Sequence, residues 1–118
     1  MDSSDVIKAL SALAQEHRLA AYRLLVQAGP DGLSAGRLSE AVGVPASSMS
    51  FHLAQLNHAA LVRQRRQSRS IIYVADFDVM NEVMGYLTEN CCGGADCAPG
   101  GISTKVCSPQ YPVEKDVA

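Results

Sequence analysis

The stretch that most constrains the fold is LSAGRLSEAVGVPASSMSFHLAQLNHAALV, residues 33–62. Ser34 is a typical N-cap for a short first helix that ends at Gly43, because glycine is preferred just beyond a helix C-terminus. Pro45 then stands where proline is tolerated, close to the first turn of a second helix. Two helices joined by so short a turn form a helix-turn-helix pattern. The second helix spans about residues 46–58 and is expected to bury Met49, Leu53 and Leu56.

The period of the apolar residues changes after this second helix. The runs LVRQRRQ and SIIYVA lie on either side of a turn at residues 67–69, which predicts a β-hairpin. A basic hairpin directly after a helix-turn-helix is the arrangement of a winged helix. The fold is therefore predicted to be mainly α with a small β-hairpin, as a winged helix-turn-helix.

Helical spacing also occurs before and after this motif. It predicts helices over residues 4–14, 16–28 and 76–90, and a winged helix-turn-helix domain over residues 1–90. Residues 91–118 lose this periodicity and are rich in Gly and Pro, so they are expected to form a cysteine-containing loop and tail. The residues of 16–28 expected to face inward are Leu19, Tyr22, Leu25 and Val26. The apolar stripe of the last helix is Val79, Met80, Val83, Met84 and Leu87, which suits either a dimer contact or the core of the chain.

The distribution of charge indicates a nucleic-acid partner. Residues 41–75 contain four arginines and no acidic residue, although the whole chain has a net charge of −2. A helix that approaches phosphates and base edges is expected to exclude carboxylates. The alternative is a helix of capping serines beside a solvated hairpin edge. The candidate DNA-binding residues are Ser47, Ser48, Ser50, His52 and Gln55 on the helix, with Arg63, Arg65, Arg66 and Arg69 on the hairpin.

These motifs carry a family resemblance. LAQEHRLAAYRLLV, LSEAVGVPASSMSFHLAQLNHAALV and the Arg-rich hairpin resemble the ArsR/SmtB family of bacterial metal-responsive repressors. The resemblance implies a homodimer formed through the first and last helices, which binds double-stranded operator DNA and releases it when an inducer binds. The familiar inducer sites of that family are absent, because LSEAVGV contains no cysteine and residues 76–90 contain no histidine.

Three of the four cysteines lie in ENCCGGADCAPG, residues 89–100. Clustered thiolates favour soft metals and metalloids, and two glycines let the chain turn back so that three sulfurs meet. Trivalent arsenic takes three sulfurs, antimonite being a second candidate. The cluster is similar to one branch of arsenic-responsive ArsR repressors, which implies the ligands Cys91, Cys92 and Cys97. A cadmium or zinc site completed by Cys107, a thiol-redox switch and inert thiols remain alternatives.

Other function classes find little support in the chain. It has no nucleophile–base pair and no glycine-rich phosphate loop, so we expect no enzyme. It shows neither a secretory signal nor an apolar stretch long enough for a membrane, so a cytoplasmic location is expected.

Overall fold

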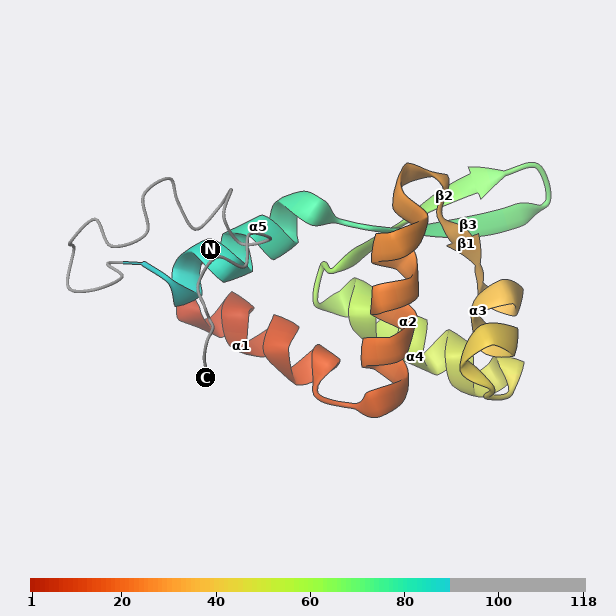
Figure 1. Cartoon of the computed structure of the whole chain (residues 1–118), viewed down its shortest axis with the longest axis horizontal. Helices are drawn as coiled ribbons and strands as arrows, with labels where there is room; N and C mark the ends of the chain where they lie inside the picture. Colours follow the sequence, from red (N-terminus) through yellow and green to blue (C-terminus); the bar gives the residue numbers. More distant parts are fainter. Residues whose placement is uncertain (90–118) are drawn as a thin grey trace, which may run out of the picture. The chain divides into compact units, whose positions relative to one another are not determined.

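The computed structural model describes residues 1–89, in which helices predominate and a short sheet carries a hairpin (Figure 1). The predicted mainly α fold with a small β-hairpin is confirmed. The elements in chain order are α1 (Ser3–Leu13), α2 (Glu16–Ala28), the 3-10 helix η1 (Gly29–Asp31), β1 (Leu33–Ser34), α3 (Ala35–Val42), α4 (Ala46–His58), β2 (Val62–Gln67), β3 (Ser70–Ala75) and α5 (Phe77–Leu87).

The hairpin forms the larger part of an antiparallel sheet with strand order β1-β3-β2. Strands β2 and β3 pair from Val62 opposite Ala75 to Gln67 opposite Ser70, so a two-residue turn joins them. Ser68 in that turn has a φ of 59°, a left-handed conformation that two-residue hairpin turns commonly require. The sequence predicted the hairpin but not β1, a strand of two residues that pairs with β3.

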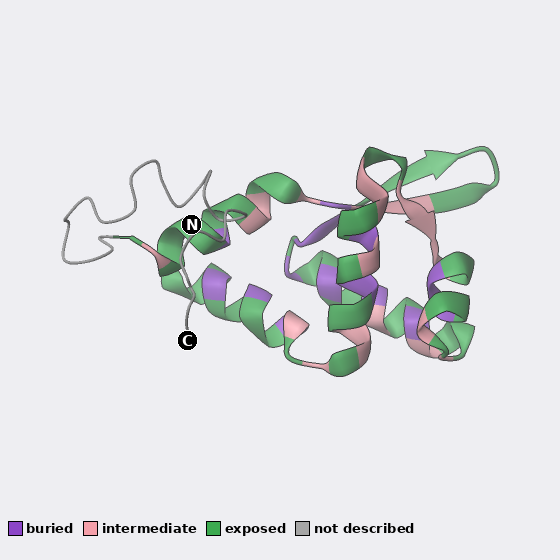
Figure 2. Cartoon of the chain, viewed as in Figure 1, coloured by how far each residue is buried: buried purple, intermediate pink, exposed green. Residues whose placement is uncertain are grey.

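The core of the region before α5 is made by one face each of α1, α2, α3 and α4, with residues at the base of the hairpin (Figure 2). The prediction for α4 is confirmed, since Met49, Leu53 and Leu56 are all fully buried. The prediction for α2 is partly wrong. Leu19 and Val26 are 44% and 40% exposed, because the buried face of α2 is the one that carries Ala21, Tyr22 and Leu25. Tyr22 and Leu25 are buried as expected.

The chain divides into two units, Met1–Met80 and Asn81–Ala118, and α5 runs across the division. Helix α5 ends at Leu87, three residues before the expected end. Within it Val83 is buried, whereas Met84 and Leu87 are 36% and 58% exposed. No helix in the described part of the chain is long and apolar enough to cross a membrane.

Gly32 fixes the close approach of the turn after η1 to β3. Its backbone has φ 67° and ψ −175°, a region that is essentially restricted to glycine, and a Cβ there would meet the backbone of Tyr73 and the side chains of Ile72 and Val74. Gly29 has a similar backbone, but a Cβ there would meet nothing within 4 Å.

We therefore expect Gly32→Ala to lower the free energy of unfolding by more than Gly29→Ala does. Backbone strain of about 1–3 kcal/mol applies to both variants, and the overlap with β3 adds a further loss of about 1–3 kcal/mol to Gly32→Ala alone. Urea denaturation of the two variants and the wild type measures the difference. Equal losses would contradict a specific contact between Gly32 and β3.

Candidate nucleic-acid interface

The helix-turn-helix is fixed by local contacts that its sequence provides. The Ser34 hydroxyl accepts the Arg37 backbone N–H at 3.2 Å and starts α3. Gly43, in the left-handed region at φ 85°, ends α3 and donates its N–H to the Ser39 carbonyl at 2.8 Å. Pro45 holds extended backbone immediately before α4. The turn therefore sets the direction in which α4 leaves α3.

Helix α4 presents a face without a carboxylate to solvent. Ser47, Ser50 and Gln55 are exposed, while Ser48 and His52 are half-buried. The helix contains no acidic residue at all, and its N-terminus carries the positive end of the helix dipole. The structure thus brings all five predicted residues of α4 onto one helix, on the sides that its buried stripe leaves free, and this surface suits an anionic partner.

His52 is held in place by the start of α2. An Arg18 Nη1 lies 3.5 Å from Nδ1 of His52, and the His17 and His52 ring centroids are 5.6 Å apart. Because an arginine only donates, this contact favours the tautomer in which Nδ1 accepts and Nε2 carries the proton. Desolvation, with the neighbouring Arg18 and His17, lowers the pKa of His52 below its ordinary value. His52 thus offers an N–H donor rather than a charge at neutral pH.

The lowered pKa of His52 makes folding stability depend on pH. Below pH 6.5 the unfolded chain takes up a proton at this imidazole more readily than the folded chain does, so stability falls as the pH falls through and below that value. We expect His52→Gln to lose less stability on acidification than the wild type. Thermal melts between pH 8 and pH 5 measure this, with His58→Gln as the matched control. An unchanged pH dependence in His52→Gln would exclude the imidazole as its source.

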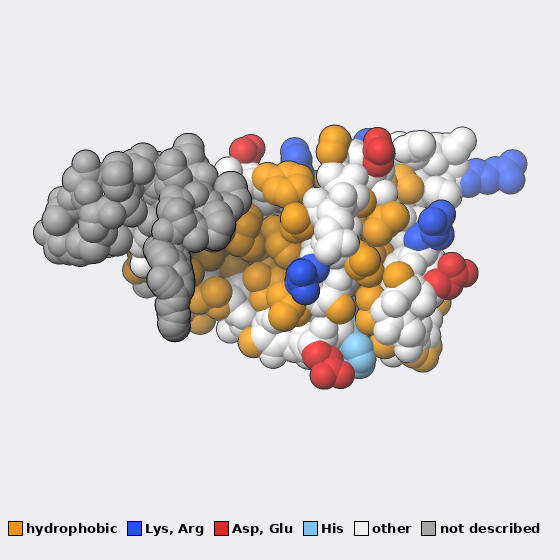
Figure 3. Space-filling view, in the orientation of Figure 1, with side chains coloured by type: hydrophobic (Ala, Val, Ile, Leu, Met, Phe, Trp, Pro, Cys, Tyr) orange, Lys and Arg blue, Asp and Glu red, His pale blue; other side chains and the backbone are white. Residues whose placement is uncertain are grey.

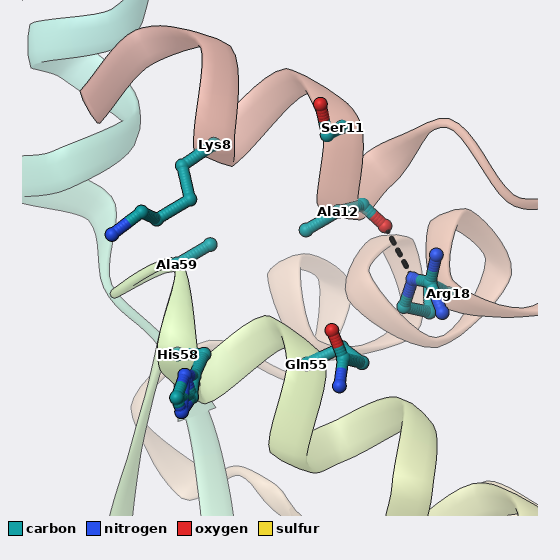
Figure 4. Close-up of a pocket in the computed structure, with 7 residues that line it drawn as sticks. All are labelled: Lys8, Ser11, Ala12, Arg18, Gln55, His58 and Ala59. Carbon is teal, nitrogen blue, oxygen red and sulfur yellow. Dashed lines mark hydrogen bonds between the residues drawn. The ribbon is translucent and has the colours of Figure 1, made fainter. Parts of the chain in front are cut away.

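A hollow of about 330 Å³ opens where α1, α2 and the end of α4 meet (Figure 4). Its polar lining has cationic and amide groups but no carboxylate. Arg18 is positioned there by its Nε, which donates to the Ala12 carbonyl at 2.7 Å. Gln55, predicted to contact DNA, lies on the wall of this hollow and shares it with basic side chains. The residues that line the hollow are Lys8, Ser11, Ala12, Arg18, Gln55, His58 and Ala59.

The structure divides the four predicted arginines of the hairpin into two pairs. The guanidinium of Arg65 donates to the backbone carbonyls of Pro30 at 2.9 Å and Asp31 at 3.2 Å, so it ties β2 to η1. The Nε of Arg63 lies 3.5 Å from a carboxylate oxygen of Asp76. Both side chains therefore already have protein partners.

Arg66 and Arg69 form the other pair, at the far end of the hairpin. Both are exposed, and among the described residues no hydrogen bond or ion pair engages either side chain. Figure 3 shows basic side chains projecting beyond the body of the molecule at the end where the hairpin lies. Two guanidinium groups are thus free to meet phosphates.

Asp76 links the hairpin to the start of α5. Its backbone N–H donates to the Leu61 carbonyl at 2.9 Å, and one carboxylate oxygen accepts the Val79 N–H at 3.2 Å as an N-cap. The other oxygen pairs with Arg63. The pKa of Tyr22 is raised, mainly by burial of its hydroxyl and to a lesser extent by the nearby Asp76 carboxylate. This hydroxyl has no hydrogen-bond partner in the described part of the chain. One carboxylate thereby holds the base of the hairpin and the first turn of α5 together.

Sequence reasoning missed three side chains of this surface. Phe51, which lies on α4, is 57% exposed. Arg18 and Asp76 position predicted residues. The exposure of Phe51 could have been predicted from the spacing of Met49 and Leu53. These two residues share one face of the helix, and the residue midway between them lies on the opposite face. The contacts of Arg18 and Asp76 join elements that are distant in the sequence, so no local sequence pattern predicts them.

Comparison with known proteins identifies the class of molecule that carries this surface. The family profile described as a helix-turn-helix domain matches residues 13–65. The HTH-type transcriptional regulator YgaV of Escherichia coli is 30% identical over 83 residues, which cover 70% of this chain and 82% of YgaV. The chain belongs to the helix-turn-helix transcriptional regulators. The predicted DNA-contact residues of α4 lie within the matched residues 13–65, as do Arg63 and Arg65. Arg66 and Arg69 come shortly after the match.

Solved structures confirm the winged helix-turn-helix fold of this regulator. Reduced HlyU from Vibrio cholerae matches with a TM-score of 0.58 and 28% identity, over 76% of this chain and 92% of that one. NolR from Sinorhizobium fredii matches with a TM-score of 0.59 and 29% identity, over 75% of this chain and 86% of NolR. An ArsR-like transcriptional regulator from Rhodococcus matches with a TM-score of 0.66, over 89% of this chain and 93% of that one. At 22% identity this match shows the shared fold. The regulator therefore has the fold of ArsR-like proteins.

The predicted inducer ligands Cys91, Cys92 and Cys97 lie outside the described residues, as does Cys107. Within residues 1–89 no three His, Cys, Asp or Glu side chains gather as a metal site would require. The three-cysteine site remains a prediction from the sequence.

Proposed function

We propose that this regulator is a homodimeric repressor that binds operator DNA through α4 and the hairpin and releases it when trivalent arsenic binds three cysteines. One observation carries the DNA-binding part. The exposed face of α4 has no carboxylate, and two arginines with no partner among the described residues stand on the hairpin that follows. A helix of this kind fits the major groove, and a hairpin of this kind fits the backbone beside it.

The surface offers two kinds of contact to DNA. Ser47, Ser50 and the Nε2–H of His52 supply neutral donors that hydrogen-bond to base edges or phosphates. Arg66 and Arg69 supply charge, which gives affinity through the release of counterions rather than through sequence reading. The hollow beside the end of α4 adds positive charge from Lys8 of α1 and Arg18 of α2.

A dimer is supported by apolar side chains that the single chain leaves exposed. On α1, Ile7 and Leu10 are 62% and 42% exposed, and on α5, Met84 and Leu87 are exposed as well. A second copy that covers these two helices would remove this surface from water. A solved relative in fold, Mb0332 from Mycobacterium bovis, is described as a homodimeric winged helix-turn-helix DNA-binding domain. A two-fold dimer would read a pseudo-palindromic operator with half-sites about 34–36 Å apart.

The inducer part is supported by the thiol chemistry of the sequence after α5. Cys91 and Cys92 follow α5 by a few residues in the sequence, and Cys97 comes five residues after Cys92, beyond two glycines, so one short segment supplies three sulfurs. Trivalent arsenic and antimony accept three thiolates, and such soft ligands select soft centres. Each subunit would bind one equivalent by itself.

An operator-binding titration tests the proposal. Sites are selected from a random duplex library, and the affinity of the wild-type protein is then measured with arsenite, antimonite, cadmium, zinc or peroxide present in turn. We expect selective binding without additives, and a loss of affinity of about 5- to 150-fold with arsenite. Failure to bind any selected duplex would refute the DNA-binding part. Release by peroxide or by zinc, but not by arsenite, would refute the choice of inducer.

Thiol-redox control is the second candidate, favoured by one comparison. A solved relative with 28% identity, HlyU, is described in its reduced form. A redox repressor would release DNA on oxidation without any metalloid. The peroxide arm of the titration separates this candidate from the arsenic-responsive one.

A further inference from the structure

We propose that Phe51 reads the C5-methyl group of a thymine in the major groove, and so determines part of the sequence that this regulator selects. The inference rests on the proposed DNA binding of α4 and adds a contact that polar recognition does not provide. It assigns a role to the one large apolar side chain that α4 exposes.

The position of Phe51 on α4 excludes a role in the core of the single chain. Met49 and Leu53, two residues before and after it, are fully buried, as is Leu56. At 100° per residue, Phe51 lies roughly opposite this buried stripe. Its 57% exposure means that more than half of an aromatic side chain faces solvent at the centre of the helix.

The neighbours of Phe51 make it project. Three of its neighbours on the helix surface, Ser47, Ser50 and Ala54, have small side chains, which leaves the ring largely uncovered. The ring also has a defined orientation, because its centroid lies 6.0 Å from that of His52 with an interplanar angle of 63°, an edge-on contact. His52 is in turn held by Arg18. Phe51 is thus a presented, oriented apolar group rather than a loose one.

Only one feature of the major groove matches such a group. Base edges there present hydrogen-bond donors and acceptors, and phosphates are anionic, so neither pairs with a benzyl side chain. The exception is the C5-methyl group of thymine, which apolar side chains contact in major-groove recognition. The serines beside Phe51 can bond to neighbouring polar edges while the ring covers the methyl group.

Replacement of thymine by deoxyuridine tests this contact, since it removes the methyl group and leaves base pairing unchanged. Sites selected by the wild-type protein are resynthesised with each thymine of a half-site changed in turn. We expect one position at which deoxyuridine weakens wild-type binding about 4-fold, and about 10- to 20-fold when both half-sites are changed, from the burial of one methyl group per half-site. At that position Phe51→Ala should be insensitive, and Phe51→Leu should keep part of the effect.

Controls separate this contact from folding and from the proposed function itself. Thermal melts should show Phe51→Ala as stable as the wild type, because the side chain is exposed, and its affinity for random duplex should be unchanged. If the wild type selects no duplex, the proposed function fails. If it does select one, but Phe51→Ala selects the same sequence and keeps the same response to deoxyuridine, the inference is wrong, and Phe51 is left for a protein partner.

Discussion

Replacing Arg66 and Arg69 together with alanine is expected to weaken operator binding by roughly 1,000-fold at 0.1 M salt. Both side chains are exposed, and neither has a partner among the described residues. A dimer would lose four phosphate contacts, and each contact contributes about −0.9 to the slope of log affinity against log salt. The slope should therefore become less steep by about 3 to 4, while the selected sequence stays the same.

The matched control is Arg63→Ala/Arg65→Ala, which removes the same charge from the same hairpin. Arg63 pairs with Asp76, and Arg65 donates to the carbonyls of Pro30 and Asp31. We expect this variant to change the salt slope less and to lower stability instead, by about 1 kcal/mol, because hydrogen bonds and a partly exposed ion pair are lost. Fluorescence anisotropy at several salt concentrations, with urea denaturation alongside, measures both effects. Equal salt slopes in the two double variants would contradict this division of the arginines.

The division of the arginines could not be predicted from the sequence, although the hairpin itself could. The change from helical to alternating spacing after Leu61 and the basic composition of the hairpin are local properties. The partners of Arg65 lie in η1, more than thirty residues earlier, and they become neighbours only because β3 pairs with both β1 and β2. A long-range contact of this kind has no local signature.

The helix faces show a related limit. The prediction that Met49 and Leu53 lie in the core is confirmed, because α4 has a single apolar stripe at helical spacing. On α2 the large residues Leu19 and Val26 were expected to face inward and are exposed, whereas Ala21, which was not expected there, is fully buried. Hydrophobicity scales with size, whereas a close crossing of helices favours a small side chain. Large apolar residues are generally expected in cores, so the size of Phe51 gave no indication that its side chain faces solvent.

Asp76 connects the two elements that the proposed function uses, the hairpin and the helix that precedes the cysteines. Its carboxylate caps α5, the helix that leads to the cysteines, and pairs with Arg63 at the base of the hairpin. A change in the first turn of α5 would therefore alter the hairpin directly. This is a physical connection between the hairpin and the first turn of α5.

Replacing Cys97 with serine is expected to abolish the response to arsenite while leaving operator affinity without arsenite unchanged. Trivalent arsenic held by three thiolates keeps only two in this variant, since a serine hydroxyl is a hard and weakly acidic donor. In the wild type, arsenite should weaken operator binding about 5- to 150-fold, and in Cys97→Ser the ratio should fall close to one. Anisotropy titrations with and without arsenite measure the ratio.

Cys107→Ser is the matched control, because it removes a thiol that lies ten residues beyond Cys97. A three-sulfur site predicts that Cys107→Ser keeps the full arsenite response, with one equivalent of arsenic bound per subunit. A tetrahedral cadmium or zinc site would need a fourth ligand, so loss of a cadmium response in Cys107→Ser would indicate four thiolates instead. An arsenite response that survives in Cys97→Ser would sink the three-cysteine site. The operator affinity of each variant is measured first without arsenite. A loss of DNA binding is therefore distinguished from a loss of the response to arsenite.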